Sequence, residues 1–167
     1  DKGNIILFKN LETIIENRTK YVNFTSAVID NLGEKAYGMT SGDYYNDGYQ
    51  DLVVGTESGK VILYNNTNGV FSKRELFDAG DYAYGLTTAD YDGDGDLDLV
   101  VGDKLGHVSL YLNDNMTFTF SRILTTREEP FGLTSGDYNL DGSIDLMVGD
   151  RLGQLTRVTK ELGVYNS

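Results

Sequence analysis

Aspartate residues recur in three short stretches at a spacing that suits a divalent cation. The densest is Asp90-Tyr91-Asp92-Gly93-Asp94-Gly95-Asp96-Leu97-Asp98, in which five carboxylates alternate along nine residues. Side-chain oxygens at positions 1, 3, 5 and 9, with a backbone carbonyl at position 7, are the hard ligands that Ca²⁺ prefers. Glycine at position 6 permits the sharp turn. The stretch predicts a Ca²⁺ site formed by Asp90, Asp92, Asp94, the Asp96 carbonyl and Asp98.

Two further stretches share this spacing. The later one offers a complete set of ligands: Asp137, Asn139, Asp141, the Ser143 carbonyl and Asp145. The earlier one is degraded because Tyr45 occupies position 3, and its candidates are Asp43, Asp47, the Tyr49 carbonyl and Asp51. We therefore expect two well-formed Ca²⁺ sites and a third, degraded one. The alternative is a set of solvated acidic turns whose side chains only cap the backbone.

An EF-hand fits these stretches poorly. Its twelfth loop position requires Glu, and here that position holds Val54, Val101 and Val148. The segment that follows each stretch also has the pattern of a strand, whereas an EF-hand loop leads into a helix.

Composition limits the other kinds of chemistry. The net charge of −12 argues against nucleic acid and anionic membranes as partners. There is no cysteine, and His107 is the single histidine, so neither a thiol nucleophile, a catalytic triad nor a zinc site is expected. We expect His107 at the surface and no enzymatic activity. The apolar runs are too short to span a bilayer.

The acidic stretches belong to a repeat. Their first aspartates lie at 43, 90 and 137, a period of 47 residues, and Gly59, Gly106 and Gly153 keep the same period. Periods of this size are typical of propellers, solenoids and arrays. Each period contains four segments with strand patterns, the content of one propeller blade. Val108 and Leu110 lie on one face of such a strand, and His107, Ser109 and Tyr111 lie on the other. Only 11–16 shows weak helical periodicity.

The predicted fold is all-β, with propeller-type four-stranded blades in about three 47-residue repeats plus a half-blade. The repeats are 37–83, 84–130 and an incomplete 131–167, preceded by a partial blade with an inserted hairpin or loop at 1–36, together forming one domain. Residues 1–8 align with 103–110, so the chain begins in the middle of a blade. Residue 1 is Asp, which leads us to expect a processed product or a piece of a longer protein.

This pattern resembles the FG-GAP/VCBS-type repeats of integrin-α-like β-propellers. The shared features are the aromatic-Gly start at 84–85 and 131–132, the acidic loop, and the Asp-Leu-Val-Val-Gly strand. The resemblance implies Ca²⁺ in loops on the outside of the blades and a role in extracellular adhesion or ligand binding. The Gly-Ala-Pro of the family is replaced by Gly55-Thr56-Glu57, Gly102-Asp103-Lys104 and Gly149-Asp150-Arg151, which favours the wider VCBS branch. Three periods are also fewer than the four to eight blades of ordinary propellers.

Four sequons suggest a secreted glycoprotein. Their candidate glycosylation sites are Asn17, Asn23, Asn65 and Asn115, of which Asn65 and Asn115 are expected in turns. The repeated aromatic residues are expected to pack the blades. The unrepeated Tyr45, Tyr49 and Tyr82 are candidates for ligand binding.

The sequence thus predicts an extracellular or cell-surface, calcium-stabilised structural or adhesion module with a protein or glycan ligand. The matching phase of the chain ends indicates either self-assembly through open blade edges, as a homo-oligomer or filament, or a missing remainder of the propeller. The alternative is a glycan-binding accessory domain of a larger secreted enzyme.

Overall fold

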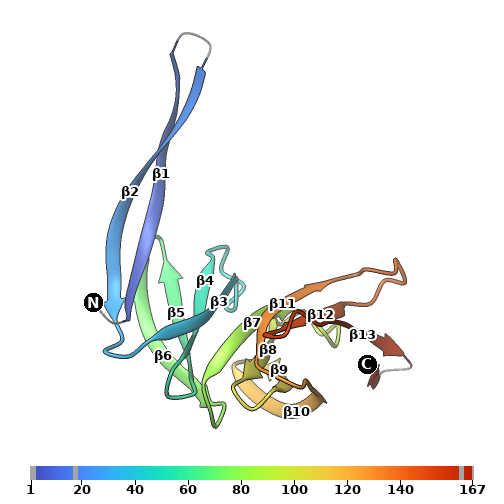
Figure 1. Cartoon of the computed structure of the whole chain (residues 1–167). Helices are drawn as coiled ribbons and strands as arrows, with labels where there is room; N and C mark the ends of the chain where they lie inside the picture. The colour runs from blue at the N-terminus through green and yellow to red at the C-terminus, as the bar shows by residue number, and fades with distance from the viewer. Residues whose placement is uncertain (1–2, 17–18, 162–163, 167) are drawn as a thin grey trace. The chain divides into compact units, whose positions relative to one another are not determined.

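The computed structural model describes residues 3–16, 19–161 and 164–166, and these residues form strands and turns without a helix. The prediction of an all-β fold is confirmed. The chain comprises two compact units, Asp1–Lys35 and Ala36–Ser167. Figure 1 labels the strands in chain order from β1 to β13.

The first unit is a single antiparallel hairpin. β1 (Asn4–Glu16) pairs with β2 (Thr19–Asn31), and the N–H of Leu32 donates to the carbonyl of Gly3 at 2.8 Å, at the open end of the hairpin. The weak helical periodicity of 11–16 is therefore misleading. The β-branched residue types at 13–15 favour a strand over a helix.

The second unit contains three four-stranded antiparallel sheets, which we call blades 1, 2 and 3 (Figure 1). Blade 1 comprises β3 (Ala36–Gly42), β4 (Asp51–Thr56), β5 (Lys60–Thr67) and β6 (Val70–Asp78). Blade 2 comprises β7 (Ala83–Ala89), β8 (Asp98–Asp103), β9 (His107–Asp114) and β10 (Thr117–Thr125). Blade 3 comprises β11 (Pro130–Gly136), β12 (Asp145–Asp150), β13 (Leu155–Glu161) and β14 (Val164–Asn166).

Each blade is a meander in which strands adjacent in sequence are adjacent in the sheet. The acidic stretches connect the first strand to the second, and we call them loops 1, 2 and 3 in chain order. A tight turn with a left-handed glycine connects the second strand to the third; for Gly106, φ is 85°. The sheets are open, because the first and fourth strands of each sheet have one neighbour.

The hydrophobic core lies between successive blades. One cluster joins Val53, Val61 and Leu63 of blade 1 to residues of blade 2, and a second joins Val100, Val108 and Leu110 of blade 2 to residues of blade 3. Blade 2 therefore has a neighbour on each face, and all six residues of β8 are buried. This explains the unbroken apolar run from Leu99 to Val101 within β8, since a sheet covered on both faces has no solvent-facing side.

Glycine allows the blades to approach closely. A Cβ atom on Gly55 would lie 2.6 Å from the carbonyl oxygen of Ala83, and one on Gly102 would lie 2.8 Å from that of Pro130. Both contacts are shorter than van der Waals distance. Gly55 and Gly102, which end the Asp-Leu-Val-Val-Gly strands, therefore leave the space into which the first strand of the next blade packs. We call this space the glycine seat of a blade.

Candidate metal site

Loop 2, between β7 and β8, brings carboxylates together as predicted. Asp90, Asp92 and Asp98 each place one oxygen within 4.8 Å of the other two, so this group could hold a metal ion. Asp94 uses Oδ1 to accept the N–H of Asp96 at 2.8 Å. The Asp96 side chain accepts the N–H of Asn115 at 2.9 Å, and ligation by the Asp96 carbonyl stays a prediction.

The first aspartate of each loop also shapes the backbone. Asp90 accepts the N–H groups of Gly93 at 2.7 Å and Gly95 at 3.0 Å. In loops 1 and 3, Asp43 and Asp137 likewise accept two backbone N–H groups each, from the residues four and five positions further on. The carboxylate oxygens of these first aspartates therefore do cap the backbone of the turns, as the alternative to a Ca²⁺ site proposes. This capping does not exclude a metal, because each carboxylate oxygen has a second lone pair.

The last aspartate of loop 2 is buried and hydrogen-bonds to two separate parts of blade 2. Asp98 is fully buried, and its two oxygens accept the N–H of Tyr91 at 2.7 Å and the N–H of Asn113 at 2.8 Å. Asp51 makes the same two bonds in blade 1, to Tyr44 at 2.9 Å and Asn66 at 2.8 Å. This residue ties the acidic loop to the third strand.

Sequence reasoning missed the asparagine on the third strand. Asn113 donates its amide to the carbonyl of Leu97 at 3.1 Å and accepts the N–H of Met116 at 2.7 Å. Asn66 makes the corresponding bonds in blade 1. The signal was available, because both asparagines follow the buried aspartate by fifteen residues.

Loop 3 leaves one buried oxygen without a partner. Asp145 accepts the N–H of Tyr138 through Oδ2 at 3.3 Å, and its Oδ1 is buried with no hydrogen-bond partner among the described residues. Lys160 stands at the position of Asn66 and Asn113 in the sequence. A buried carboxylate oxygen without a partner is costly, and a cation is one group that would satisfy it.

Burial and like charges act together on Asp98. The pKa of its carboxyl is raised to about 6, mainly by burial; the two backbone donors oppose the shift, and the charges of Asp92 and Asp94 add to it. Burial likewise raises the pKa of Asp51, with smaller contributions from Asp47 and Asp43. The metal-free loops thus contain anionic groups whose charged form is disfavoured, which is the electrostatic condition that a cation relieves.

Loops 1 and 3 differ from loop 2. Among the described residues, the acidic groups of these loops do not form a cluster of three, so their Ca²⁺ sites stay predictions. Tyr45 and Tyr49 of loop 1 are both exposed. In loop 3, Asn139 donates its amide to Asp141 at 2.8 Å, and Asp141 accepts the N–H of Ser143 at 2.8 Å, which lowers the pKa of Asp141.

The tyrosine at position 2 of loops 1 and 2 bonds to the following blade. Tyr44 donates its hydroxyl to Thr88 Oγ1 at 2.9 Å, and the hydroxyls of Tyr91 and Ser135 hydrogen-bond at 2.6 Å. Both rings are buried, and burial raises the pKa of both phenols. These tyrosines pack between blades, and they link loops 1 and 2 to the blade after their own.

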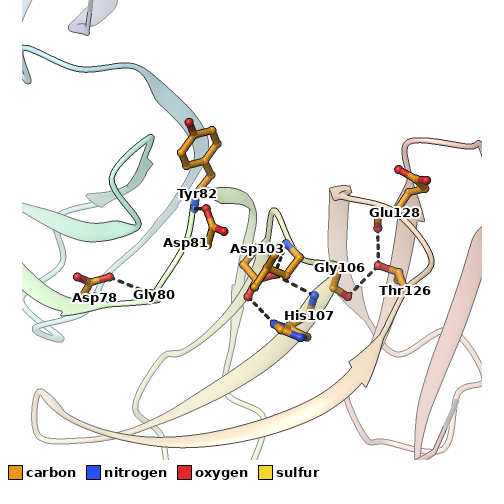
Figure 2. A network of polar contacts seen from close by, with 10 residues as sticks. Asp78, Gly80, Asp81, Tyr82, Asp103, Gly106, His107, Thr126 and Glu128 are labelled. Carbon is orange, nitrogen blue, oxygen red and sulfur yellow. Dashed lines mark hydrogen bonds and ion pairs between the residues drawn. The ribbon is translucent and has the colours of Figure 1, made fainter.

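His107 does not lie freely at the surface as the sequence suggested. Its side chain is 22% exposed, and Nδ1 lies 2.8 Å from Oδ2 of Asp103. Figure 2 shows that Asp103 also accepts the N–H of His107, at 3.0 Å, and that Thr126 bonds to the carbonyl of the nearby Gly106 at 2.9 Å. The contacts between Asp103 and His107 span the turn between β8 and β9, and they hold the imidazole partly buried.

The structure corrects one of the predicted glycosylation positions. Asn65 lies within β5 opposite Ser72, not in a turn, and its Oδ1 is buried. Asn115 does lie in a turn, between β9 and β10, and is exposed. Asn17 and the side chain of Asn23 lie outside the described residues. Among the described residues, no helix has both the length and the apolar composition to cross a bilayer.

Comparison with known proteins agrees with the repeat. The model of the FG-GAP-like repeat matches residues 43–101 and 90–148. Each match begins at the first aspartate of an acidic loop, and the two matches together span 43–148, well over half of the chain. A comparison with curated proteins finds no match. On the strength of its three acidic loops and its propeller-type blades, the chain belongs to the FG-GAP-like repeat family.

Proposed function

We propose that the chain is a Ca²⁺-stabilised, non-enzymatic structural or adhesion module of an extracellular or cell-surface protein. The observation that carries the proposal is the convergence of Asp90, Asp92 and Asp98 in loop 2. Oxygen-only ligands from a short acidic loop favour Ca²⁺ over softer metals. Asp94 and the carbonyl of Asp96 would complete the ligand set.

The ion would act on stability. Carboxylates this close repel one another by on the order of 1 to 3 kcal/mol per pair, between the limits for water and for a protein surface. A bound dication converts this repulsion into attraction. Because Asp98 bonds to β9 and Tyr91 bonds to blade 3, the stabilisation would extend beyond the loop to blade 2 and its joint with blade 3.

The character of the loop supports an extracellular location. All the proposed ligands come from nine consecutive residues, and Asp92 and Asp94 are exposed. Open sites of this kind in extracellular modules bind Ca²⁺ with Kd on the order of 10⁻⁴ to 10⁻³ M. Such a site would be filled outside cells and largely empty in the cytosol.

The roles of the titratable groups support a non-enzymatic reading. Among the described residues, the clustered aspartates cap loops or bond to strands, and the single histidine is held by Asp103. A general base needs access to a substrate proton, and Asp98, whose pKa is raised, is buried with both oxygens occupied by backbone donors.

Calcium titration tests the proposal. Isothermal titration calorimetry or terbium luminescence should detect binding in the millimolar range or tighter, and Asp92→Asn should weaken it at least several-fold. Asp114→Asn is the control, since Asp114 is exposed and lies outside the loops. Absence of binding at millimolar Ca²⁺, or equal binding by both variants, would contradict the proposal.

A groove beside loop 1 favours one second candidate, a glycan-binding accessory domain of a larger secreted enzyme. The groove has a volume of about 270 Å³ and is lined by Tyr44, Tyr45, Asn46, Asp96, Asn115 and Met116. An aromatic wall beside amide and carboxylate groups suits a sugar. On a glycan array, Tyr45→Ala should abolish binding while Tyr49→Ala, equally exposed but outside the groove, retains it. A silent array for the unmodified chain would remove this candidate.

Glycosylation at Asn115 is part of the extracellular proposal. Its turn position and exposure suit attachment of a glycan better than the strand position of Asn65. After secretion from a eukaryotic host, Asn115→Gln should remove a glycan mass that Asn65→Gln leaves in place. A mass spectrum without glycan on the unmodified protein would contradict it.

A further inference from the structure

The two internal joints between blades define a face that blade 3 leaves uncovered. We call the rear face of a blade the side that, in blades 1 and 2, packs against the next blade. On this face Val61 and Val108 are 0% exposed. Leu155 stands at the same place in blade 3, two periods after Val61, and is 76% exposed. The apolar side chain at this position is thus buried in blades 1 and 2 and exposed in blade 3.

The loop tyrosines show the same difference. Tyr44 and Tyr91 are 4% and 2% exposed and bond to hydroxyls of the next blade. Tyr138, at the same position in loop 3, is 45% exposed, and within the described part of the chain its hydroxyl bonds to Thr134 of its own blade, at 3.4 Å. The rear face of blade 3 therefore carries an available phenol beside its exposed leucine.

The glycine seat of blade 3 is vacant as well. A Cβ atom on Gly149 would meet the flexible end of Leu155 at 3.3 Å and otherwise only the carbonyl of Gly132 at 3.8 Å. Gly55 and Gly102 have the backbone of the next blade at this place. A largely apolar hollow of about 200 Å³ occupies the seat, lined by Gly132, Leu133, Thr134, Met147, Val148, Gly149 and Leu155.

The front strand of blade 1 carries the matching groups. In the first joint, Ala83 and Leu86 of the next blade's first strand lie against Gly55. In the second, Pro130 lies against Gly102, and Leu133 lies against Gly85. Met39 of β3 is the equivalent residue of blade 1 and is 59% exposed, against 7% for Leu86. Ser41, also exposed, stands at the position of Thr88 and so offers a hydroxyl where the tyrosine partner belongs.

We propose that the rear face of blade 3 binds strand β3 of a second copy of this chain. Met39 of the second copy fills the hollow at Gly149 and Leu155, and its Ser41 bonds to Tyr138. The argument for this occupant is continuity with a joint that the chain itself forms twice, because the repeat places apolar and hydroxyl side chains of the two surfaces at the positions that meet in the internal joints. The proposal goes beyond the proposed function and does not depend on Ca²⁺.

The contact joins different surfaces on the two copies. Such heterologous contacts give rings when the rotation closes and filaments when it does not. Arg157 stands on the rear face where Leu63 and Leu110 are buried in the other blades, and it is exposed. The apolar area is therefore smaller than in the internal joints, and association should be reversible and dependent on concentration. The sequence suggested open blade edges as the route to self-assembly; the structure points to a blade face.

Complementary variants test the proposal. In analytical ultracentrifugation, the unmodified chain should show species larger than a monomer that grow with concentration. Leu155→Asp and Met39→Asp should each be monomeric, because each removes one side of the contact. A mixture of the two should form a one-to-one dimer and nothing larger, since one intact rear face and one intact front strand remain.

Val70→Asp is the control, because Val70 is exposed at a hairpin end outside both surfaces. All three substitutions are at exposed positions, and unchanged circular dichroism would verify folding. A chain that stays monomeric at every concentration would overturn the proposal. Association that survives both Leu155→Asp and Met39→Asp would overturn it too, and loss in Leu155→Asp alone would exclude β3 as the occupant.

Discussion

The hydroxyl of Tyr44 donates to Thr88 Oγ1 at 2.9 Å, and this bond joins an acidic loop of one blade to the first strand of the next. The bond recurs 47 residues later between Tyr91 and Ser135. In both cases the backbone N–H of the same tyrosine bonds to the buried last aspartate of its loop. A single residue type thus couples loop geometry to the packing between blades.

Removing one of these hydroxyls should weaken the joint. Tyr91→Phe leaves the ring in place and deletes the bond to Ser135, so we expect a loss of about 1 kcal/mol in the free energy of unfolding. Tyr138→Phe should change stability by less than about 0.5 kcal/mol, because that hydroxyl lies on an uncovered face. Urea denaturation of dilute protein measures both. Equal losses would show that the inter-blade bond contributes nothing specific.

The seats of the blades should differ in their tolerance of a methyl group. Gly102→Ala forces a Cβ against the carbonyl of Pro130, and we expect destabilisation of roughly 1 to 3 kcal/mol, the usual cost of overpacking. Gly149→Ala places its Cβ 3.3 Å from the end of the Leu155 side chain and 3.8 Å from the carbonyl of Gly132, so it should be close to neutral. Urea denaturation of dilute protein again provides the comparison. A large loss in Gly149→Ala would mean that the seat of blade 3 is already filled.

Loop 3 contains a residue with a strained backbone conformation, and a substitution should relieve that strain. Leu140 has φ of 62° and is 88% exposed, whereas loops 1 and 2 place Asn46 and Gly93 at this position. The left-handed conformation costs an ordinary residue about 1 kcal/mol, and asparagine tolerates it better. Leu140→Asn should therefore raise the midpoint of thermal unfolding by a few degrees. Leu105→Asn, an exposed leucine without positive φ, should not, and a gain in both would indicate a solubility effect instead.

The sequence was sufficient for the features that repeat locally. The period of 47 located the acidic loops, the turn glycines such as Gly106, and the four strands of each blade. It could not separate the two roles of the loop aspartates. Asp98 looks like the fourth carboxylate ligand in the sequence, yet it also accepts a bond from Asn113, fifteen residues away, which depends on the pairing of β8 with β9. The exposure of Leu155 was equally inaccessible, because burial on a rear face depends on contacts between blades, which the period does not specify.

The two roles of the aspartates can be separated by measuring stability with and without Ca²⁺. Asp98→Asn replaces one acceptor by a donor that faces a backbone N–H, so it should cost about 2 kcal/mol or more even in EDTA. Asp92→Asn keeps an oxygen able to accept the weak 3.3 Å bond from Asp94 and removes one of the repelling charges, so in EDTA it should be at least as stable as the unmodified chain. In millimolar Ca²⁺ the unmodified chain should gain stability, as any ligand that binds only the folded state confers, and Asp92→Asn should lose most of that gain. The readout is the midpoint of thermal unfolding for each protein in both buffers. If EDTA leaves the unmodified chain unchanged, the aspartates of loop 2 act only as backbone caps and the Ca²⁺ proposal fails.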